Sequence, residues 1–253
     1  MANWFKEFRR KHFSAKINLE EYAFDRQGDV RTDIKSKYGY DGPLLDLFVN
    51  NKDVLVHKWH HFFPIYELYF SAWRNRPLRF LEIGVSEGGS LQMWRRFFGE
   101  EAVIFGIDIN PDCAALNGRD GQVRIGSQAD SSFLESVLQE MGGVDVVLDD
   151  GSHRMDHVLA TLQFLMPRLA DGGIYMIEDL HTAYWPRFGG GYRSVDNFFN
   201  VVRRITDDMH HWYHKLPMQY PEISSHCRAI HTYDSIVVLE KGELLKPVHS
   251  QIV

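Results

Sequence analysis

The chain is short of cysteine and of long apolar runs, and each shortage excludes a class of protein. Its two cysteines, Cys113 and Cys227, are too few for a disulfide framework, so we expect both to be reduced in a cytoplasmic protein. No stretch approaches the roughly 18 consecutive apolar residues of a transmembrane helix, so no membrane span is predicted. Residues 1–22 carry basic side chains but no continuous apolar segment, so no secretory signal is predicted either.

An excess of positive charge is also missing. The 28 Lys and Arg are outnumbered by 34 Asp and Glu, which leaves a net charge of −6. A protein that works mainly on nucleic acid needs a basic surface, so no nucleic-acid partner is predicted. Apolar residues make up 44% of the 253 residues, which is too many for a mainly disordered chain.

The chain changes character near residue 76. Residues 1–75 have aromatic and apolar side chains at helical spacing, as in the run from His60 to Phe70, and are predicted to form a helical extension. Residues 76–253 instead alternate short apolar runs with helical segments. We predict strands at 78–83, 102–107, 122–125, 144–148, 173–177, 229–232 and 235–240, and helices at 90–98, 131–141, 157–169 and 195–211.

This alternation predicts an α/β fold in which a mostly parallel sheet has helices on both faces. The last two predicted strands are joined by a short turn at Tyr233 and Asp234, so an antiparallel C-terminal hairpin is expected at one edge. The strands of the parallel part end in acidic residues, which are Glu82, Asp108, Asp149, Asp150, Glu178 and Asp179. Open α/β sheets bind ligands beyond the carboxyl ends of their strands, so these carboxylates are expected to converge on a ligand site.

The turn after the first of these strands favours one kind of ligand. Gly84 and Gly88 let the backbone approach a ligand closely, because glycine has no Cβ. Asp108 ends the next strand, where a carboxylate can accept hydrogen bonds from both hydroxyls of a ribose. Glu82 beside the turn would repel a pyrophosphate but suits a cationic amino group. A nucleoside with a positive centre therefore fits better than NAD.

These motifs resemble those of the class I S-adenosylmethionine (SAM)-dependent methyltransferases. The resemblance lies in the glycine loop LEIGVSEGGS, in FGIDIN and in the terminal hairpin. Three further stretches, VDVVLDDGSHRMDH, IEDLHTAYWP and KWHHFFPIYE, resemble the metal-dependent macrolide and deoxysugar O-methyltransferases of the mycinamicin, tylosin and calicheamicin type. The resemblance covers about residues 55–240 and implies a Rossmann-like sheet and Mg²⁺-dependent methylation of a sugar hydroxyl, on a nucleotide-linked deoxysugar or a glycosylated natural product.

The resemblance also implies roles for individual residues. Asp150, Glu178 and Asp179 would hold Mg²⁺, and His153 would be the general base. General chemistry agrees, because clustered carboxylates repel one another unless a cation neutralises them, and all-oxygen ligation favours Mg²⁺ or Ca²⁺ over zinc. The remaining implied contacts are Gln128 and Asp130 near the adenine, Asp149 at the methionine amino group, and Tyr184 and Trp185 as a wall for the sugar.

Each of these residues also has a purely structural interpretation. An acidic residue after a strand often caps the next helix, and a tryptophan most often packs in a core. His157 lies four residues after His153 and is interpreted as structural, whereas His181 is a reserve candidate for the base. The N-terminal extension is expected to cover the active site or to mediate homo-oligomerisation.

Two other functions stay open. A catechol-type O-methyltransferase also uses Mg²⁺ and vicinal hydroxyls, but it would typically place a lysine near the third strand, and no lysine occurs between residues 59 and 214. A non-catalytic SAM-binding protein of the cephalosporin hydroxylase-like group shares similar motifs. Loss of a ligand residue would favour that second alternative, yet all the carboxylates and the histidine are present.

Overall fold

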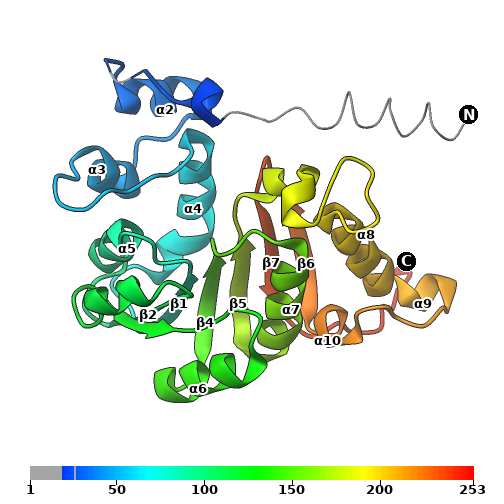
Figure 1. Ribbon diagram of the computed structural model, residues 1–253. Coiled ribbons are helices and arrows are strands. Elements are labelled where there is room, and N and C mark those ends of the chain that lie inside the picture. The colour runs from blue at the N-terminus through cyan, green and yellow to red at the C-terminus, as the bar shows by residue number, and fades with distance from the viewer. Residues whose placement is uncertain (1–18, 26) are drawn as a thin grey trace, which may run out of the picture.

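The computed structural model describes residues 19–25 and 27–253, and the centre of this part is a seven-stranded sheet (Figure 1). Its strands are β1 (Leu78–Ile83), β2 (Ala102–Asp108), β3 (Gln122–Ile125), β4 (Val144–Asp149), β5 (Leu169–Ile177), β6 (Cys227–Thr232) and β7 (Val237–Lys241). Their order is β3-β2-β1-β4-β5-β7-β6. The first five strands are parallel, whereas β7 is antiparallel to β5 and β6 is antiparallel to β7. The predicted parallel sheet with an antiparallel C-terminal hairpin is confirmed.

The central strands form because their apolar residues are buried on both faces, as is usual in parallel sheets. Neighbouring residues of β1 divide between two cores, with Phe80 in one and Leu81 in the other. Helix α5 (Gly89–Phe98) packs in the first core, and α6 (Ser131–Met141), α7 (Met155–Leu165) and α8 (Phe198–Met209) pack in the second. The helices therefore cover both faces, as expected.

Several predicted boundaries in the C-terminal half are wrong. The helix predicted over 157–169 begins at Met155 and ends at Leu165, and β5 begins at Leu169 instead of residue 173. The cause is a pairing across the sheet: Leu169 pairs with Val144, and a register shift then separates that pair from the regular ladder. Helix α8 begins three residues later than predicted because the Asn197 side chain accepts a hydrogen bond from the amide of Phe199 and caps the helix there.

The N-terminal part packs directly against the sheet. Its helices are α2 (Val30–Tyr38), α3 (Pro43–Val49) and α4 (Phe63–Phe70), preceded by the 3₁₀ turn η1 (Leu19–Tyr22). Tyr66 and Phe70 of α4 contact the ring of Trp94, with centroids 5.2 and 5.5 Å apart. One core therefore crosses the predicted boundary at residues 75 and 76. Residues 1–18 of the predicted extension lie outside the described residues, and its role in oligomerisation stays a prediction.

The remaining elements are short helices and 3₁₀ turns between residues 60 and 224. They are α9 (His211–His214), α10 (Pro221–Ser224) and the 3₁₀ turns η2 (His60–Phe62), η3 (Ser71–Trp73), η4 (Pro111–Leu116), η5 (Met166–Arg168), η6 (Leu180–Tyr184) and η7 (Pro186–Phe188). Within the described residues, no helix combines the length and apolarity that crossing a membrane requires.

Candidate active site

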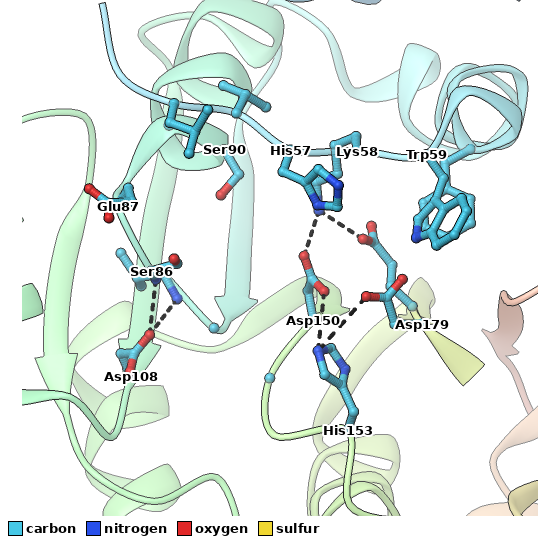
Figure 2. Close-up of a pocket in the computed structure, with 18 residues that line it drawn as sticks. His57, Lys58, Trp59, Ser86, Glu87, Ser90, Asp108, Asp150, His153 and Asp179 are labelled. Atoms are coloured by element: carbon cyan, nitrogen blue, oxygen red, sulfur yellow. Dashed lines mark hydrogen bonds and ion pairs between the residues drawn. The ribbon is translucent and has the colours of Figure 1, made fainter. Parts of the chain in front are cut away.

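A cavity of about 330 Å³ lies at the carboxyl ends of β1, β4 and β5 (Figure 2). Residues 55–59, an extended stretch before α4 that we call the strap, form one wall. The turn after β1, the loop after β4 and the residues after β5 form the others. A second cavity of about 170 Å³ shares Gly84, Asp108 and Gly151 with the first. The strand ends therefore create a ligand site where the sequence predicts one.

The glycine turn is shaped by close backbone contacts. Gly84 has φ +92°, and a Cβ there would lie 2.2 Å from the carbonyl oxygen of Asp150, so no other residue fits without a shift. Gly88 has φ +85° and directly precedes α5. At Gly89, a Cβ would lie 2.1 Å from the carbonyl oxygen of Leu55, because the strap crosses the start of α5. Gly84 lines both cavities. Gly88 lines neither, but the next residue, Gly89, lines the larger one.

Asp108 lies beside this turn and lines both cavities. Its Oδ2 accepts hydrogen bonds from the amides of Val85 and Ser86 at 2.9 and 3.0 Å, and its Oδ1 accepts one from the amide of Asn110 at 2.8 Å. Partial burial would raise the pKa of Asp108, but these hydrogen bonds outweigh it and hold the pKa below the usual value. Asp108 is therefore an ionised carboxylate that supports the glycine turn from inside the ligand site.

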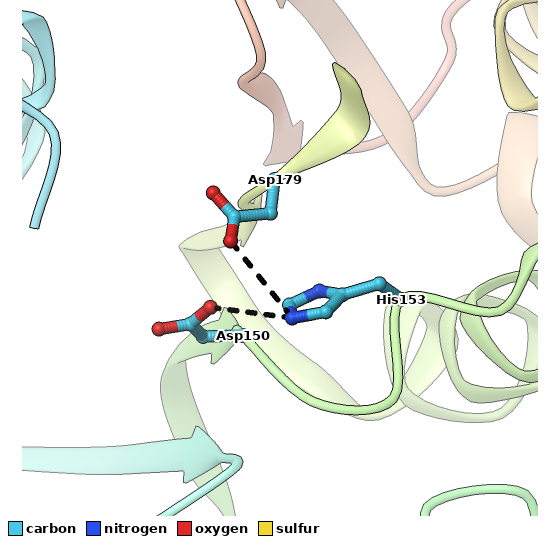
Figure 3. A group of neighbouring side chains, drawn as sticks. All are labelled: Asp150, His153 and Asp179. Atoms are coloured by element: carbon cyan, nitrogen blue, oxygen red, sulfur yellow. Dashed lines mark ion pairs between the residues drawn. The ribbon is translucent and has the colours of Figure 1, made fainter. Parts of the chain in front are cut away.

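Three side chains converge at the floor of the larger cavity (Figure 3). His153 Nε2 lies 4.0 Å from Asp150 Oδ1 and 3.9 Å from Asp179 Oδ2, and one ligand atom of each residue lies within 4.8 Å of the others. Oδ1 of Asp179 is buried without a hydrogen-bond partner among the described residues. Two carboxylates, one of them with an oxygen that has no hydrogen-bond partner, and an imidazole make a donor set that fits a divalent cation.

Backbone strain supports a functional role for this group. His153 and Asp179 both have φ +55°, and Ser86 across the cavity has φ +49°. Left-handed conformations cost a residue other than glycine about 1–3 kcal/mol and persist where surrounding structure enforces them, typically at functional sites. The fold accepts this cost at three residues of one cavity.

Glu178, the third predicted metal ligand, lines the same cavity but lies outside the group of Asp150, His153 and Asp179. Its side chain is buried, its Oε1 accepts a hydrogen bond from the Tyr66 hydroxyl at 2.5 Å, and its Oε2 accepts one from Lys58 Nζ at 2.7 Å. Burial raises the pKa of Glu178, and the Lys58 ammonium acts in the opposite direction. The structure brings His153 and not Glu178 into the group formed with Asp150 and Asp179.

Lys58 is the main site residue that the sequence analysis missed. Its Nζ donates to Asp150 Oδ2 at 2.6 Å as well as to Glu178, across 92 and 120 positions of sequence. Burial would lower the pKa of Lys58, but the carboxylates of Asp150, Glu178 and Glu82 outweigh it and raise the pKa well above the usual value. Lys58 lies one residue outside the lysine-free window, so the absence of lysine cannot be used against a catechol-type enzyme. Lys58 is the first residue of the KWHHFFPIYE stretch, so the motif that carries the resemblance already contained it.

Two predicted SAM contacts are buried behind the cavities. Glu82 is fully buried, its Oε1 accepts a hydrogen bond from Trp94 Nε1 at 3.1 Å, and burial raises its pKa to about 7. Asp149 accepts hydrogen bonds from Gln128 and from the Tyr175 hydroxyl, and burial raises its pKa to about 6. Neither residue lines either cavity, so both carboxylates lie one layer below the ligand site.

Gln128 and Asp130, both predicted near the adenine, have different positions. Gln128 lines the smaller cavity, and its Oε1 accepts a hydrogen bond from the amide of Ser152 at 2.7 Å. Asp130 is exposed, and its side chain accepts hydrogen bonds from the amides of Ser132 and Phe133 as the N-cap of α6. For Asp130, helix capping is the role that the contacts support.

Tyr184 and Trp185, the residues predicted to form a wall for the sugar, line neither cavity. Tyr184 lies outside both cavities and stacks on Phe199, with centroids 5.7 Å apart. Trp185 also lies outside them, and its ring contacts that of His181 at 4.9 Å. Trp59 of the strap lines the larger cavity. Its ring also contacts that of His181, with centroids 5.4 Å apart. Trp59 was not predicted as a wall residue.

His157 and His181 are each held by a hydroxyl group. His157 Nδ1 lies 3.0 Å from Ser152 Oγ, which agrees with its structural interpretation. His181 Nδ1 lies 2.7 Å from Ser235 Oγ and 3.9 Å from Asp179 Oδ1. His153 is the histidine that faces both open carboxylates.

Comparison with known proteins gives a consistent result. Residues 81–180 match the family model described as a methyltransferase domain. The chain is 36% identical over 200 residues to an 8-demethyl-8-(2-methoxy-alpha-L-rhamnosyl)-tetracenomycin-C 3'-O-methyltransferase of Streptomyces olivaceus, covering 73% of this chain and 50% of the relative. It is 35% identical over 209 residues to the demethylmacrocin O-methyltransferase of Streptomyces fradiae, covering 74% and 51%. The chain thus spans about half the length of these curated relatives.

A solved structure agrees with the sequence relatives. The MycE methyltransferase from the mycinamycin biosynthetic pathway, in complex with Mg and SAH, superimposes with a TM-score of 0.68 at 30% sequence identity. The match covers 87% of this chain and 55% of that chain. Residues 81–180 thus match a methyltransferase domain, and the chain resembles the macrolide sugar O-methyltransferases in sequence and in fold.

Proposed function

We propose that this protein transfers the methyl group of SAM to a hydroxyl group of a sugar, with a divalent cation, Mg²⁺, held at the edge of the sheet. The observation that carries the proposal is the convergence of Asp150, His153 and Asp179 beside a cavity built on the glycine turn and Asp108. The relatives' names support the chemistry, because each is an O-methyltransferase of a glycosylated natural product. The acceptor is thus a small-molecule sugar or glycoside.

The two cavities together suit the methyl donor. Asp108 would accept the ribose hydroxyls, and the glycine turn would run along the methionine part of the donor. The smaller cavity is lined by Ile83, Ile107 and Ile109, whose apolar side chains suit a flat adenine ring. Glu82 and Asp149, which are buried just behind, would not contact the donor.

The metal ligands supported by the geometry are Asp150 and Asp179. Glu178 would join them only through lone pairs that Tyr66 and Lys58 leave free. When bound, a divalent cation supplies positive charge that makes a neighbouring hydroxyl more acidic. His153 would take the proton of the acceptor hydroxyl, whose oxygen then bonds to the methyl carbon as the carbon–sulfur bond breaks and S-adenosylhomocysteine leaves.

Product analysis by mass spectrometry tests the proposal directly. The protein is incubated with SAM and Mg²⁺ and a panel of sugar nucleotides, glycosides and catechols, and each acceptor is examined for a gain of one methyl group. We expect methylation of a sugar, and loss of that activity in EDTA because the carboxylate group then has no divalent ion. Methylation of catechols alone would favour the catechol-type alternative, which the buried Lys58 keeps open.

A matched pair of variants tests the donor site. Asp108→Ala is expected to weaken SAM binding by roughly 10- to 100-fold, because hydrogen bonds to a charged group contribute about 1.5–3 kcal/mol. Asp130→Ala should leave SAM affinity unchanged and cost about 0.5–2 kcal/mol of stability, because Asp130 caps α6. Calorimetry measures SAM affinity, and thermal unfolding measures stability. Equal SAM affinity in wild type and Asp108→Ala would remove the ribose assignment.

The SAM-binding protein without turnover is the other alternative, and SAM binding without any methylated product across the panel would favour it. The cytoplasmic location and the homo-oligomeric state expected from sequence stay predictions. Size-exclusion chromatography with light scattering measures the oligomeric state.

A further inference from the structure

The carboxylate group at the sheet edge already contains a buried cation. Lys58 reaches it from the strap, with only 3% of its side chain exposed, and ion-pairs with Asp150 and Glu178, whose side chains are 23% and 1% exposed. Removing an ammonium group from water costs several kcal/mol unless carboxylates compensate for it. The carboxylates therefore offset the cost of burying the Lys58 ammonium, and the ammonium reduces the repulsion between the carboxylates.

The two oxygens of Asp150 face different partners. Oδ2 accepts from Lys58 at 2.6 Å, whereas Oδ1 faces His153. Figure 2 shows Lys58 and His153 on opposite sides of the Asp150 carboxylate, with Asp179 next to His153. All of these residues line the larger cavity, and Asp150 divides them into a more deeply buried half, with Lys58 and Glu178, and a more open half, with His153 and Asp179.

Lys58 offsets part of the negative charge of the group. Its ammonium contacts two of the three carboxylates of Asp150, Glu178 and Asp179. Without Lys58, a divalent cation on the open side of Asp150 would face more uncompensated negative charge and less positive charge at short range.

We propose that Lys58 acts as a permanent counter-cation of this group, and that its positive charge keeps the affinity for the divalent ion low. The inference rests on the proposed metal site. Lys58 stays on the buried side of Asp150 while the ion occupies the open side, so the two cations share one carboxylate.

Binding of Mn²⁺ alone, without donor or acceptor, tests this on the whole chain. Lys58→Met is expected to bind Mn²⁺ at least about tenfold more tightly in calorimetry, because a positive charge a few ångströms from the ion is removed. Lys58→Arg keeps the charge and should bind like wild type. Lys52→Met, which removes an exposed lysine six residues earlier, is the matched control and should leave the affinity unchanged. A purely structural role for Lys58 would predict weaker binding.

Thermal unfolding covers the case in which Lys58→Met is unstable without metal. Because a ligand that binds the folded state stabilises it, Mn²⁺ should raise the Tm of Lys58→Met more than that of wild type. Mn²⁺ binding by Lys58→Met that is no tighter than wild type, or a Tm shift no larger, overturns the inference. If folded wild type itself binds no Mn²⁺, the proposed metal site fails instead, so the two failures are distinguishable.

Discussion

Asp150→Ala is expected to reduce turnover by a factor on the order of 10³ or more while SAM still binds. A bound metal ion contributes several kcal/mol to stabilising developing negative charge, and Asp150 supplies one of its oxygens. The same substitution removes an ion-pair partner of Lys58, which then retains Glu178 alone. The loss should therefore appear in the methylation rate and in Mn²⁺ affinity together.

The measurement follows S-adenosylhomocysteine formation across a Mg²⁺ titration, beside calorimetry of SAM binding. Asp150→Asn serves as the matched variant, because it keeps the shape of the side chain and removes its charge. SAM binding should be largely retained in both variants. The part of Asp150 that lies against Gly84 of the glycine turn is its backbone carbonyl, which neither substitution changes. Full activity of Asp150→Ala, or of wild type in EDTA, would contradict the metal-dependent mechanism.

His153→Ala is expected to lower kcat by about 10²–10⁴-fold, the usual contribution of a general base. His153 Nε2 lies about equally far from Asp150 and Asp179, a position from which it can take a proton or ligate the ion. Mn²⁺ affinity distinguishes the role of general base from the role of metal ligand. As a base, His153 can be removed without changing Mn²⁺ affinity, whereas as a ligand its loss weakens Mn²⁺ binding.

His210→Ala is the control for this variant. His210 lies at the C-terminal end of α8, outside both cavities, so its loss should leave kcat nearly unchanged. If His153→Ala keeps the wild-type rate at saturating substrate, His153 is not the base. A large fall in kcat for His181→Ala would then identify the reserve candidate.

Patterns along the chain were enough to predict the sheet, because apolar runs, glycine turns and helix spacing are local properties. They were also enough to predict that carboxylates gather at one edge, since parallel strands bring their carboxyl ends together. Asp108, Asp150, His153 and Asp179 all line the larger cavity for this reason. The predicted helix end at 169 failed because Leu169 pairs with Val144 across the sheet.

What each acidic side chain does was decided by contacts between distant segments. Asp108 ends β2 and Asp130 lies in the loop after β3, yet one supports the glycine turn and the other caps a helix. Glu178 and Asp179 are neighbours and both line the larger cavity, but Glu178 is held by Tyr66 and Lys58 while Asp179, with φ +55°, faces His153. Side-chain direction at the end of a strand depends on what packs around it, and the partner of Glu178 comes from 120 positions away. Sequence determined which groups meet at the edge, and tertiary packing alone decided which of them face the ligand.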